Sequence, residues 1–375
     1  MLHADRHPAR IVAAALLLGV AFLLALEWFT RPAATQVVGE RFGYQPDPQG
    51  VADFLAELPQ PLFRDAGAEA MRKSVEVDTF LFRSMDKAHR ARYGKPFVVG
   101  RQGIGDCIAW GAAHAVYCAE SVSWELGQAA EPPLMPATES IYGGARVESR
   151  GKSGDGTSPV GGWSDGATGW GAAKWLRDWG VVYRQQYETV DLTTYSADRA
   201  KAYGAYGNGG QGDAGRLDKV AKRHPCRHVV AVRTWEELVA AIGSGFPVTI
   251  ASSVGFNSGP RDADGFCAAS GTWMHQMSIL STRFAKNAPP GTSRPRDGAL
   301  VLNSWGNYVA GGKFPPDQPD GSFWISRSDA ERILAQGDSY AIGSVETGFK
   351  WRDLHNGNWF APPPVETLTM KEQDR

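Results

Sequence analysis

The stretch LVLNSWGN, residues 300–307, passes from an apolar run typical of a buried β-strand into a polar sequence that contains a tryptophan. An asparagine side-chain oxygen can accept a hydrogen bond from one ring nitrogen of a histidine, which fixes the tautomer of the ring. A tryptophan beside that bond excludes water and strengthens it. The stretch therefore predicts that Asn303, covered by Trp305, orients a histidine from elsewhere in the chain. Taken alone, it is a turn with a packed tryptophan.

The candidate histidine is His275, which opens the apolar run HQMSILST, residues 275–282. This run predicts a buried strand, and a histidine at the start of a strand can point into a cleft while the strand supplies rigidity. Two of the eight histidines, His3 and His7, stand before the apolar N-terminal stretch. For any single histidine, a purely structural role is the alternative.

The segment RQGIGDCIAW, residues 101–110, supplies a candidate nucleophile, Cys107. Apolar residues recur at helical spacing from Cys107 to about residue 127, so we expect a helix that begins at this cysteine. Asp106 stands directly before it and is a good N-cap residue. The unpaired N–H groups and the dipole at a helix N-terminus favour a thiolate. Cys118 lies further along the same face and is interpreted as a core residue.

Helical patterns dominate the first half of the chain, and short β-rich runs dominate the second. A glycine-rich stretch, residues 151–171, is followed by a second helix that ends at Gly180. One helix interrupts the later β-rich runs, with Thr234 as its cap and Glu237 at capping-box spacing. The β-rich runs are HVVAV, PVTIASSVGFN, HQMSILST, ALVLNSWG and GSFWIS. This order predicts an α+β protein with a helical lobe and a β-rich lobe.

The amino terminus carries the apolar stretch IVAAALLLGVAFLLAL, residues 11–26. With Trp28 and Phe29 it reaches roughly 19 residues, which is enough to cross a bilayer as a helix. Two arginines precede it. The positive-inside bias therefore places residues 1–10 in the cytoplasm and the body of the protein on the exported side. We expect a single-pass signal-anchor over residues 11–29, and a cleaved signal peptide is the alternative.

The composition excludes several function classes. The 375 residues include 39 Lys and Arg and 40 Asp and Glu without a long basic run, which argues against nucleic acid as a partner. Four cysteines are too few for a disulfide scaffold, although Cys226 and Cys267 can pair in an oxidising compartment. No C-x-x-C pair is present, and we expect neither a metal site nor a cofactor.

Residues 30–94 are expected to form a linker followed by a helical arm. Prolines, glycines and polar residues mark the linker, and residues 66–93 contain a helical pattern. The arm is either a pro-segment or a structure packed on the main body, and the sequence leaves both possibilities open. At the other end, residues 351–375 contain APPP and are expected to form an extended tail.

In this order, Gln102, Cys107, His275 and Asn303 resemble the papain-like cysteine peptidase family. QGIGDC is similar to the family's segment at the start of its central helix, HQMSIL to its histidine strand, and LNSWG almost letter for letter to its asparagine motif. Further similar segments are PVTIASSVGFN, GWGAAKWLRDWGVV and GGKFPPDQPDGSFWIS. The resemblance covers roughly residues 95–345 and implies the two-lobed papain-like fold.

The resemblance also implies a catalytic role for three of these residues. Cys107 would be the nucleophile, held as a thiolate paired with an imidazolium at His275. His275 would then protonate the leaving amine, and Asn303 would orient its ring.

Four more residues complete the predicted site. Gln102, together with the backbone N–H of Cys107, would form the oxyanion hole. Trp305 would shield the asparagine–histidine contact, and Ser304 and Asp106 would support the site. Gln102 stands one position closer to the cysteine than the family's glutamine, and Asp106 replaces a serine. A carboxylate beside a thiolate raises the pKa of the thiol unless it is turned away as a cap.

The implied catalytic domain spans residues 95–350, with a helical lobe at about 95–185, a β lobe at about 186–345 and the cleft between them. The predicted function is that of a membrane-tethered cysteine endopeptidase, which hydrolyses a peptide or protein substrate through a thioester acyl-enzyme. One alternative is a catalytically silent papain-like binding module. The other is a related cysteine acyltransferase or amidase, in which a different nucleophile resolves the same intermediate.

Overall fold

The computed structural model describes residues 41–150, 159–160, 165–188, 190–212, 214–226, 228–343 and 348–354. All of them belong to one unit of the chain, residues 38–375. The predicted cytoplasmic segment 1–10 and signal-anchor 11–29 lie outside the described residues, as does most of the predicted tail, from residue 355 onward. Within the described ranges, no helix is both long enough and apolar enough to cross a membrane.

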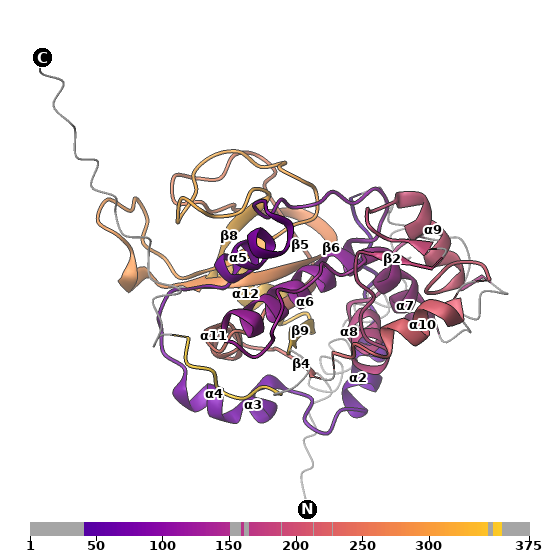
Figure 1. Ribbon diagram of the computed structural model, residues 1–375. Coiled ribbons are helices and arrows are strands. Elements are labelled where there is room, and N and C mark those ends of the chain that lie inside the picture. The colour runs from indigo at the N-terminus through magenta and orange to yellow at the C-terminus, as the bar shows by residue number, and fades with distance from the viewer. Residues whose placement is uncertain are drawn as a thin grey trace, which may run out of the picture. The chain divides into compact units, whose positions relative to one another are not determined.

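Seven strands form one antiparallel sheet in the order β4-β9-β5-β6-β7-β8, with the short β1 paired to β6 (Figure 1). Every position of β7 and β9 is buried, so these strands lack the alternation expected when one face of a sheet meets water. Both faces of the sheet therefore contribute to the core. The bounds are Thr79–Phe80 (β1), Val229–Ala231 (β4), Val248–Phe256 (β5), Ala269–Arg283 (β6), Gly298–Leu302 (β7), Ser322–Ser326 (β8) and Asp338–Ile342 (β9).

The helix predicted from Cys107 is confirmed as α6, residues Cys107–Glu125, which is buried along nearly its whole length. It packs directly on β6, where the Ser278 hydroxyl donates to the carbonyl of Gly111 at 2.5 Å. Gly111 permits this close approach, because a Cβ there would lie 2.9 Å from the side chain of Gln276. The contact sets the first turns of α6 beside the strand that carries His275.

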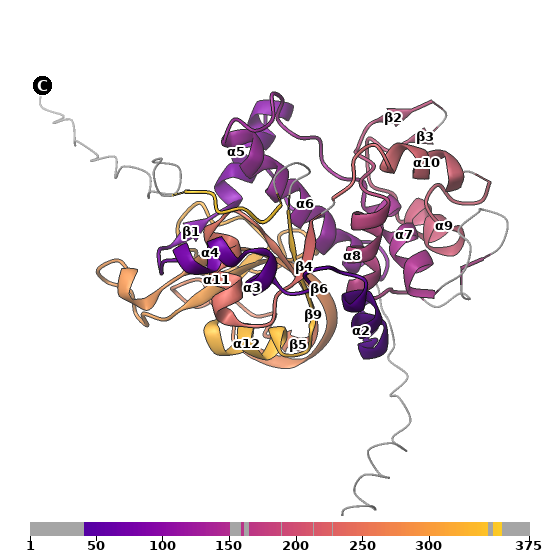
Figure 2. The ribbon, with the colours of Figure 1, turned by 90° about the horizontal axis from the view of Figure 1, so that it is seen from below.

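The remaining helices of the first lobe lie on the other side of α6. Figures 1 and 2 both show these helices on one side of α6 and the sheet on the other. The second predicted helix is confirmed as α8, and the φ of Gly180 just beyond it is 108°, a value that favours glycine. The bounds are Thr138–Arg150 (α7), Gly169–Asp178 (α8), Ala197–Tyr206 (α9) and Ala214–Ala221 (α10), with a small hairpin of Gln186–Tyr187 (β2) and Val190–Asp191 (β3).

A fully buried carboxylate ties this lobe together. Glu139, in the first turn of α7, forms ion pairs with Arg184 at 3.0 Å and with Arg199 at 3.1 Å. It also accepts the backbone N–H of Ser196, the N-cap of α9. A buried charge without partners is costly. The loops around α9 are therefore held where their donors can reach the Glu139 carboxylate.

Residues 41–94 form an arm that is built into the body of the protein. The helical pattern predicted over residues 66–93 is interrupted: α4, residues Ala68–Lys73, and α5, residues Phe82–Tyr93, are separated by β1. Pairing of Phe80 with Ser281 on β6 supplies sheet hydrogen bonds at this point, and these replace the helical ones. The arm begins with α2 (Pro48–Ala56) beside α8 and continues through α3 (Phe63–Ala66).

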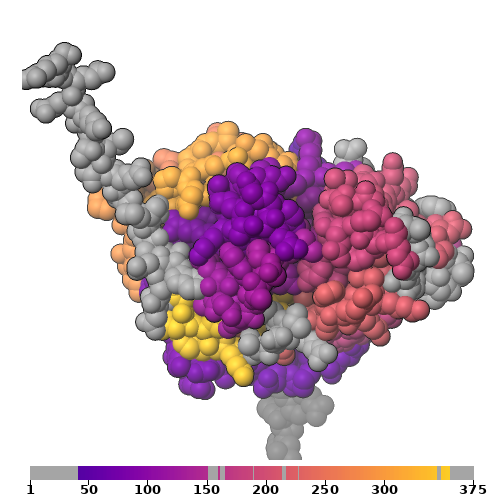
Figure 3. Space-filling view, viewed as in Figure 1, coloured from indigo at the N-terminus to yellow at the C-terminus, as the bar shows by residue number. Residues whose placement is uncertain are grey.

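The arm also forms part of the molecular surface. In the space-filling view, the dark violet atoms around its helix α5 lie at the upper centre of the face shown, above the more magenta atoms of α6 (Figure 3). On the sheet, the predicted helix after Thr234 is confirmed as α11, residues Trp235–Gly243, and the threonine hydroxyl accepts the N–H of Glu237. A further helix, α12 (Arg327–Leu334), follows β8.

All four cysteines are free thiols in this structure, so Cys226 and Cys267 do not form the disulfide that the sequence allowed. The two residues pack in different hydrophobic clusters, Cys226 beside the helical lobe and Cys267 beneath the sheet. Packing in separate clusters leaves each sulfur without the other as a neighbour.

Candidate active site

The imidazole of His275 and the amide of Asn303 meet as the sequence predicts. His275 lies in β6 and Asn303 directly follows β7, which pairs with β6. The Nε2 atom of His275 is 2.7 Å from Oδ1 of Asn303, and both residues are 1% exposed. The same oxygen accepts the N–H of Ser304 at 2.7 Å, so the asparagine is itself held in place. Nδ1 of His275 has no hydrogen-bond partner within the described ranges and is the nitrogen left for proton transfer.

Aromatic rings enclose this pair. The structure places the Trp305 ring 4.8 Å from the His275 ring, centroid to centroid, with 34° between the planes. The ring of Phe42 meets the edge of both rings, at 6.1 Å from His275 and 5.7 Å from Trp305. Water is therefore largely excluded from the hydrogen bond between His275 and Asn303, which strengthens it.

Cys107 lies at the first position of α6, and its side chain is fully buried. The side-chain amide of Gln276, the residue after His275, donates to the carbonyl of Ile108, the residue after Cys107, at 2.8 Å. The backbone N–H groups of Gln276 and of Gly43 in the arm act to lower the thiol pKa. The thiol therefore lies beside the strand that carries the imidazole. Sequence positions that are far apart thus converge at one place.

Burial keeps both reacting groups neutral in this arrangement. It raises the pKa of the Cys107 thiol to about 12, and the nearby Asp106 adds to the rise against the lowering effect of the two N–H groups. Burial likewise lowers the pKa of His275 to about 4, although Asn303 opposes the shift. The thiolate–imidazolium pair that the resemblance implies is thus not the favoured state while the site is covered.

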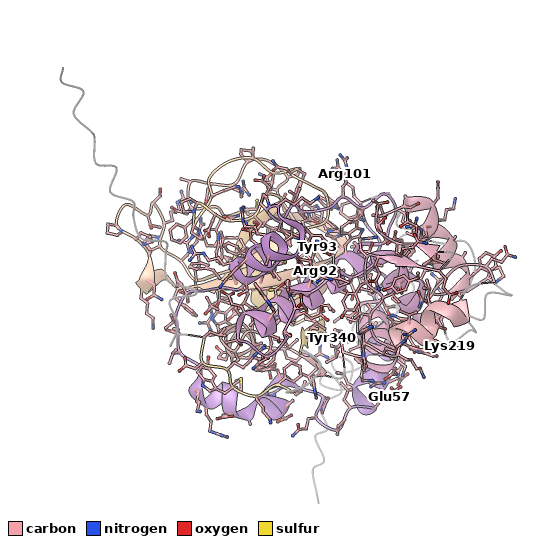
Figure 4. The ribbon with its side chains drawn as sticks, in the orientation of Figure 1. Glu57, Arg92, Tyr93, Arg101, Lys219 and Tyr340 are labelled. Carbon is pink, nitrogen blue, oxygen red and sulfur yellow. The ribbon has the colours of Figure 1, made fainter. Side chains whose placement is uncertain are left out.

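Gln102 lies against the segment that carries Asn303. Its N–H donates to the carbonyl of Ser304 at 2.8 Å, and the Ser304 hydroxyl donates to its Oε1 at 2.5 Å. Its Nε2 donates to the carbonyl of Ile104 within its own loop at 2.9 Å. Arg101 continues the pairing through a bridge to Trp305, and Figure 4 labels it near the edge of the molecule. The structure thereby brings Gln102, Ser304 and Trp305 together.

Asp106 stands at the N-cap position of α6, as predicted, but its side chain makes no capping hydrogen bond. Its carboxylate instead accepts the hydroxyl of Tyr195 through Oδ2 at 3.0 Å, and Oδ1 has no partner among the described residues. Burial raises the pKa of Asp106 well above its usual value, with the carboxylates of Asp165 and Glu139 adding to the shift. Protonation of this carboxyl removes the repulsion that its ionised form exerts on a thiolate.

The arm crosses the site as an extended segment, residues 41–45. The N–H groups of Gly43 and Tyr44 donate to the carbonyl of Met274 at 3.1 and 3.0 Å. On the other lobe, Ala167 donates to the carbonyl of Gly43 and accepts from the N–H of Gln45, both at 2.9 Å. The segment therefore bridges the residue before His275 and the loop before α8.

Gly43 lies very close to the turn that precedes α6. A Cβ at this position would lie 1.8 Å from the carbonyl oxygen of Gly105, two residues before Cys107. Only glycine fits there. The sequence RFGYQ contains no pattern that distinguishes this segment from an ordinary linker, so sequence reasoning missed its place beside the turn before Cys107.

The two lobes, with Cys107 at the start of the central helix and His275 and Asn303 on the sheet, define a papain-like fold. Xylellain, a cysteine protease from Xylella fastidiosa, is similar to this chain with a TM-score of 0.50 and 19% identity, over 84% of this chain and all 100% of that one. At this level of identity the likeness establishes the fold.

Two other solved structures are similar at lower scores. Procathepsin B from Trypanosoma congolense has a TM-score of 0.49 and 12% identity, covering 82% of this chain and 87% of its own. Procathepsin L 3 from the Tenebrio molitor larval midgut has a TM-score of 0.45 and 15% identity, covering 91% and 94%. No protein-family model matches the sequence, and no curated protein matches it either.

Proposed function

We propose that this protein is a cysteine peptidase in which Cys107, His275 and Asn303 carry out the chemistry. The observation that carries the proposal is the 2.7 Å contact between His275 Nε2 and Asn303 Oδ1, made beside a helix that begins with Cys107. A nucleophilic cysteine needs a base within reach and a group that orients the base, and these three residues supply both.

The proposed reaction follows from these positions. Nδ1 of His275 takes the thiol proton, and the sulfur attacks the carbonyl carbon of the scissile peptide bond. The backbone N–H of Cys107 and the amide of Gln102 receive the oxyanion. His275 gives the proton to the leaving amine, which leaves a thioester on Cys107. Water, deprotonated by the same imidazole, then releases the acid and restores the thiol.

In the arrangement described above, residues 41–45 occupy the place that a substrate needs. The N–H of Gly43 donates to the carbonyl of Met274, the residue before His275, and Phe42 packs on His275. We propose that this segment keeps the peptidase latent, and that turnover requires the segment to leave. A latent form suits an exported peptidase, because it prevents cleavage before the chain reaches its destination.

The cellular setting is part of the proposal and is based on sequence. The apolar stretch at residues 11–29 would tether the protein as a single-pass signal-anchor, with residues 1–10 in the cytoplasm and the catalytic domain on the exported side. The substrate would be a peptide or protein. Nucleic acid is not expected as a partner, because the net charge is −1 and no basic run is present.

Active-site labelling tests the function. The full-length chain with Gly43→Ala, which should displace residues 41–45, and the same chain with the additional change Cys107→Ala are incubated with a peptide library and with an alkylating peptide probe, and the modified residue is mapped by mass spectrometry. We expect cleavage products and labelling at Cys107 in the first chain, and neither in the second. Cys118→Ala is the matched control, because this second buried thiol of α6 has no histidine partner in the mechanism. Cleavage that survives the Cys107→Ala change would overturn the proposal.

A catalytically silent binding module is the second candidate. One observation favours it: burial keeps the thiol protonated and the imidazole neutral in the covered site. The labelling experiment separates the two, since a binding module would give no cleavage even after the segment at 41–45 has been displaced. A cysteine acyltransferase or amidase would label at Cys107 and would transfer its acyl group to an amine or act on a side-chain amide.

A further inference from the structure

The loop before α8 holds the turn before Cys107 through one carboxylate. Oδ2 of Asp165 accepts the backbone N–H of Gly105 at 2.6 Å. The backbone of Gly105 lies so close to Asp165 that a Cβ on Gly105 would be 2.9 Å from the carboxyl carbon. The turn at residues 103–106 is therefore attached to the helical lobe just before the catalytic helix begins.

Asp165 is itself fixed by residues of α7. Its Oδ1 accepts the hydroxyl of Tyr142 and also the N–H of its neighbour Gly166, the latter at 2.8 Å. Arg146, one turn along α7, donates to the carbonyl of Gly166 at 2.6 Å and stacks over the Tyr142 ring. Tyr142 and Arg146 are both buried. The carboxylate thus has three donors on its two oxygens, and a well-ordered helix determines its position.

The turn that Asp165 holds joins the two groups proposed to bind the oxyanion. Gln102 stands at its start and the N–H of Cys107 at its end. Its two glycines have no side chains with which to pack, so hydrogen bonds must supply the order. The N–H of Gly103 has a matching acceptor, the hydroxyl of Tyr195 at 3.0 Å. Oxyanion donors act only when they are held at the right place before the charge develops.

We propose that Asp165 is a positioning residue for the oxyanion hole of this site, acting through the N–H of Gly105. The inference rests on the proposed peptidase function. Asp165 touches neither the thiol nor the substrate in this assignment. It sets the distance between the Gln102 amide and the Cys107 N–H, and so its loss weakens the binding of the tetrahedral intermediate and leaves the nucleophile intact.

Two reactions of Cys107 separate this role from a general effect on the fold. Hydrolysis of a peptide ester or amide needs the oxyanion hole, whereas alkylation by iodoacetamide needs only an ionised thiol. The full-length chain with Gly43→Ala, which opens the site, is the reference. In this background we expect Asp165→Asn to lower kcat about 100-fold, with KM and the alkylation rate changed less than about threefold. The amide keeps the size of the carboxylate but turns N–H groups toward the donors.

Two further variants supply an independent test of the same contact and a matched control. Tyr142→Phe removes one donor and should lower kcat about tenfold while the chain stays folded, as judged by thermal unfolding. Asp191→Asn is the matched control, since this exposed carboxylate also accepts a backbone N–H, that of Thr193. Turnover by Asp165→Asn and Tyr142→Phe within threefold of the reference would overturn the inference, and so would a parallel fall in alkylation. A reference chain that alkylates at Cys107 but cleaves nothing would instead refute the peptidase function.

Discussion

The Nε2 atom of His275 lies 2.7 Å from Oδ1 of Asn303, and Nδ1 has no hydrogen-bond partner in the described part of the chain, so Nδ1 is the nitrogen proposed to exchange a proton with Cys107. The tautomer is therefore set by a residue on a neighbouring strand. A ring free to rotate would spend much of its time with the wrong nitrogen toward the sulfur. The asparagine thus orients the imidazole and carries no charge of its own.

Replacing this asparagine tests the relationship. In the Gly43→Ala background, Asn303→Ala should lower kcat by about 10- to 100-fold, because the imidazole loses its orientation but keeps its basicity. Progress curves with a fluorogenic peptide measure the change. Asn287→Ala, at an exposed position outside the site, is the control and should have no effect. Unchanged turnover in Asn303→Ala would contradict the orienting role.

Adding one methyl group at Gly43 should open the site. Because a Cβ at Gly43 would lie 1.8 Å from the carbonyl oxygen of Gly105, Gly43→Ala should displace the segment from the thiol. A steric penalty of about 1–3 kcal/mol corresponds to roughly a 5- to 150-fold faster alkylation of Cys107. Gly243→Ala is the matched control, since a Cβ there meets nothing within 4 Å. Equal rates in both variants would mean that residues 41–45 do not limit access.

The ionisation of the thiol should change with the same substitution. In the closed chain the pKa of Cys107 is raised to about 12 and that of His275 lowered to about 4, so both stay neutral near neutral pH. Opening admits water, which lowers the thiol pKa and raises the imidazole pKa toward the usual values. The thiolate absorbance in the ultraviolet, taken as a difference from Cys107→Ser, should therefore appear at lower pH in Gly43→Ala than in the parent. A thiolate already present at neutral pH in the parent would contradict the neutral closed state.

The buried side chain of His114 should lower the free energy of unfolding at acid pH. It is buried in α6, neither ring nitrogen has a hydrogen-bond partner in the described part of the chain, and burial lowers its pKa to about 4. The unfolded chain binds the proton below about pH 6.5, and the folded chain excludes it until about pH 4. The free energy of unfolding therefore falls as the pH falls through this window, by up to about 3 kcal/mol from this residue.

The variant His114→Leu removes this pH-dependent contribution to the free energy of unfolding. Its free energy of unfolding should match or exceed that of the parent at pH 7, since no hydrogen bond is lost, and the difference should grow in its favour toward about pH 4. Urea unfolding at several pH values measures the difference. His224→Leu, at a half-buried position, serves as the comparison and should show a smaller change. A constant difference across the window would contradict the assignment.

The local elements of this protein could be predicted because their signals are short-range. The helix from Cys107, the strands around His275 and Asn303, and the cap at Thr234 follow from apolar periodicity and from side chains within a few positions of each other. The Asn303 motif points to a histidine partner through chemistry alone. Two local features differ from the sequence-based expectation because of tertiary contacts. Pairing of β1 with β6 divides the helical pattern at residues 66–93, and the hydroxyl of Tyr195, distant in the sequence, donates to the carboxylate of Asp106.

The sequence by itself determined which residues meet in the site, since residue type and the order of elements restrict the choice. Only the tertiary structure decided the state of that site. The closure by Gly43 depends on how the arm meets the two lobes, and the hydrogen bond from Gly105 to Asp165, which lie 60 positions apart, depends on how the helical lobe folds. Neither contact produces a periodic or spacing pattern in the sequence. A backbone N–H, or the absence of a Cβ at a glycine, does not indicate which distant residue will lie beside it. The burial that keeps the thiol and the imidazole neutral arises from that same approach of the lobes and the arm.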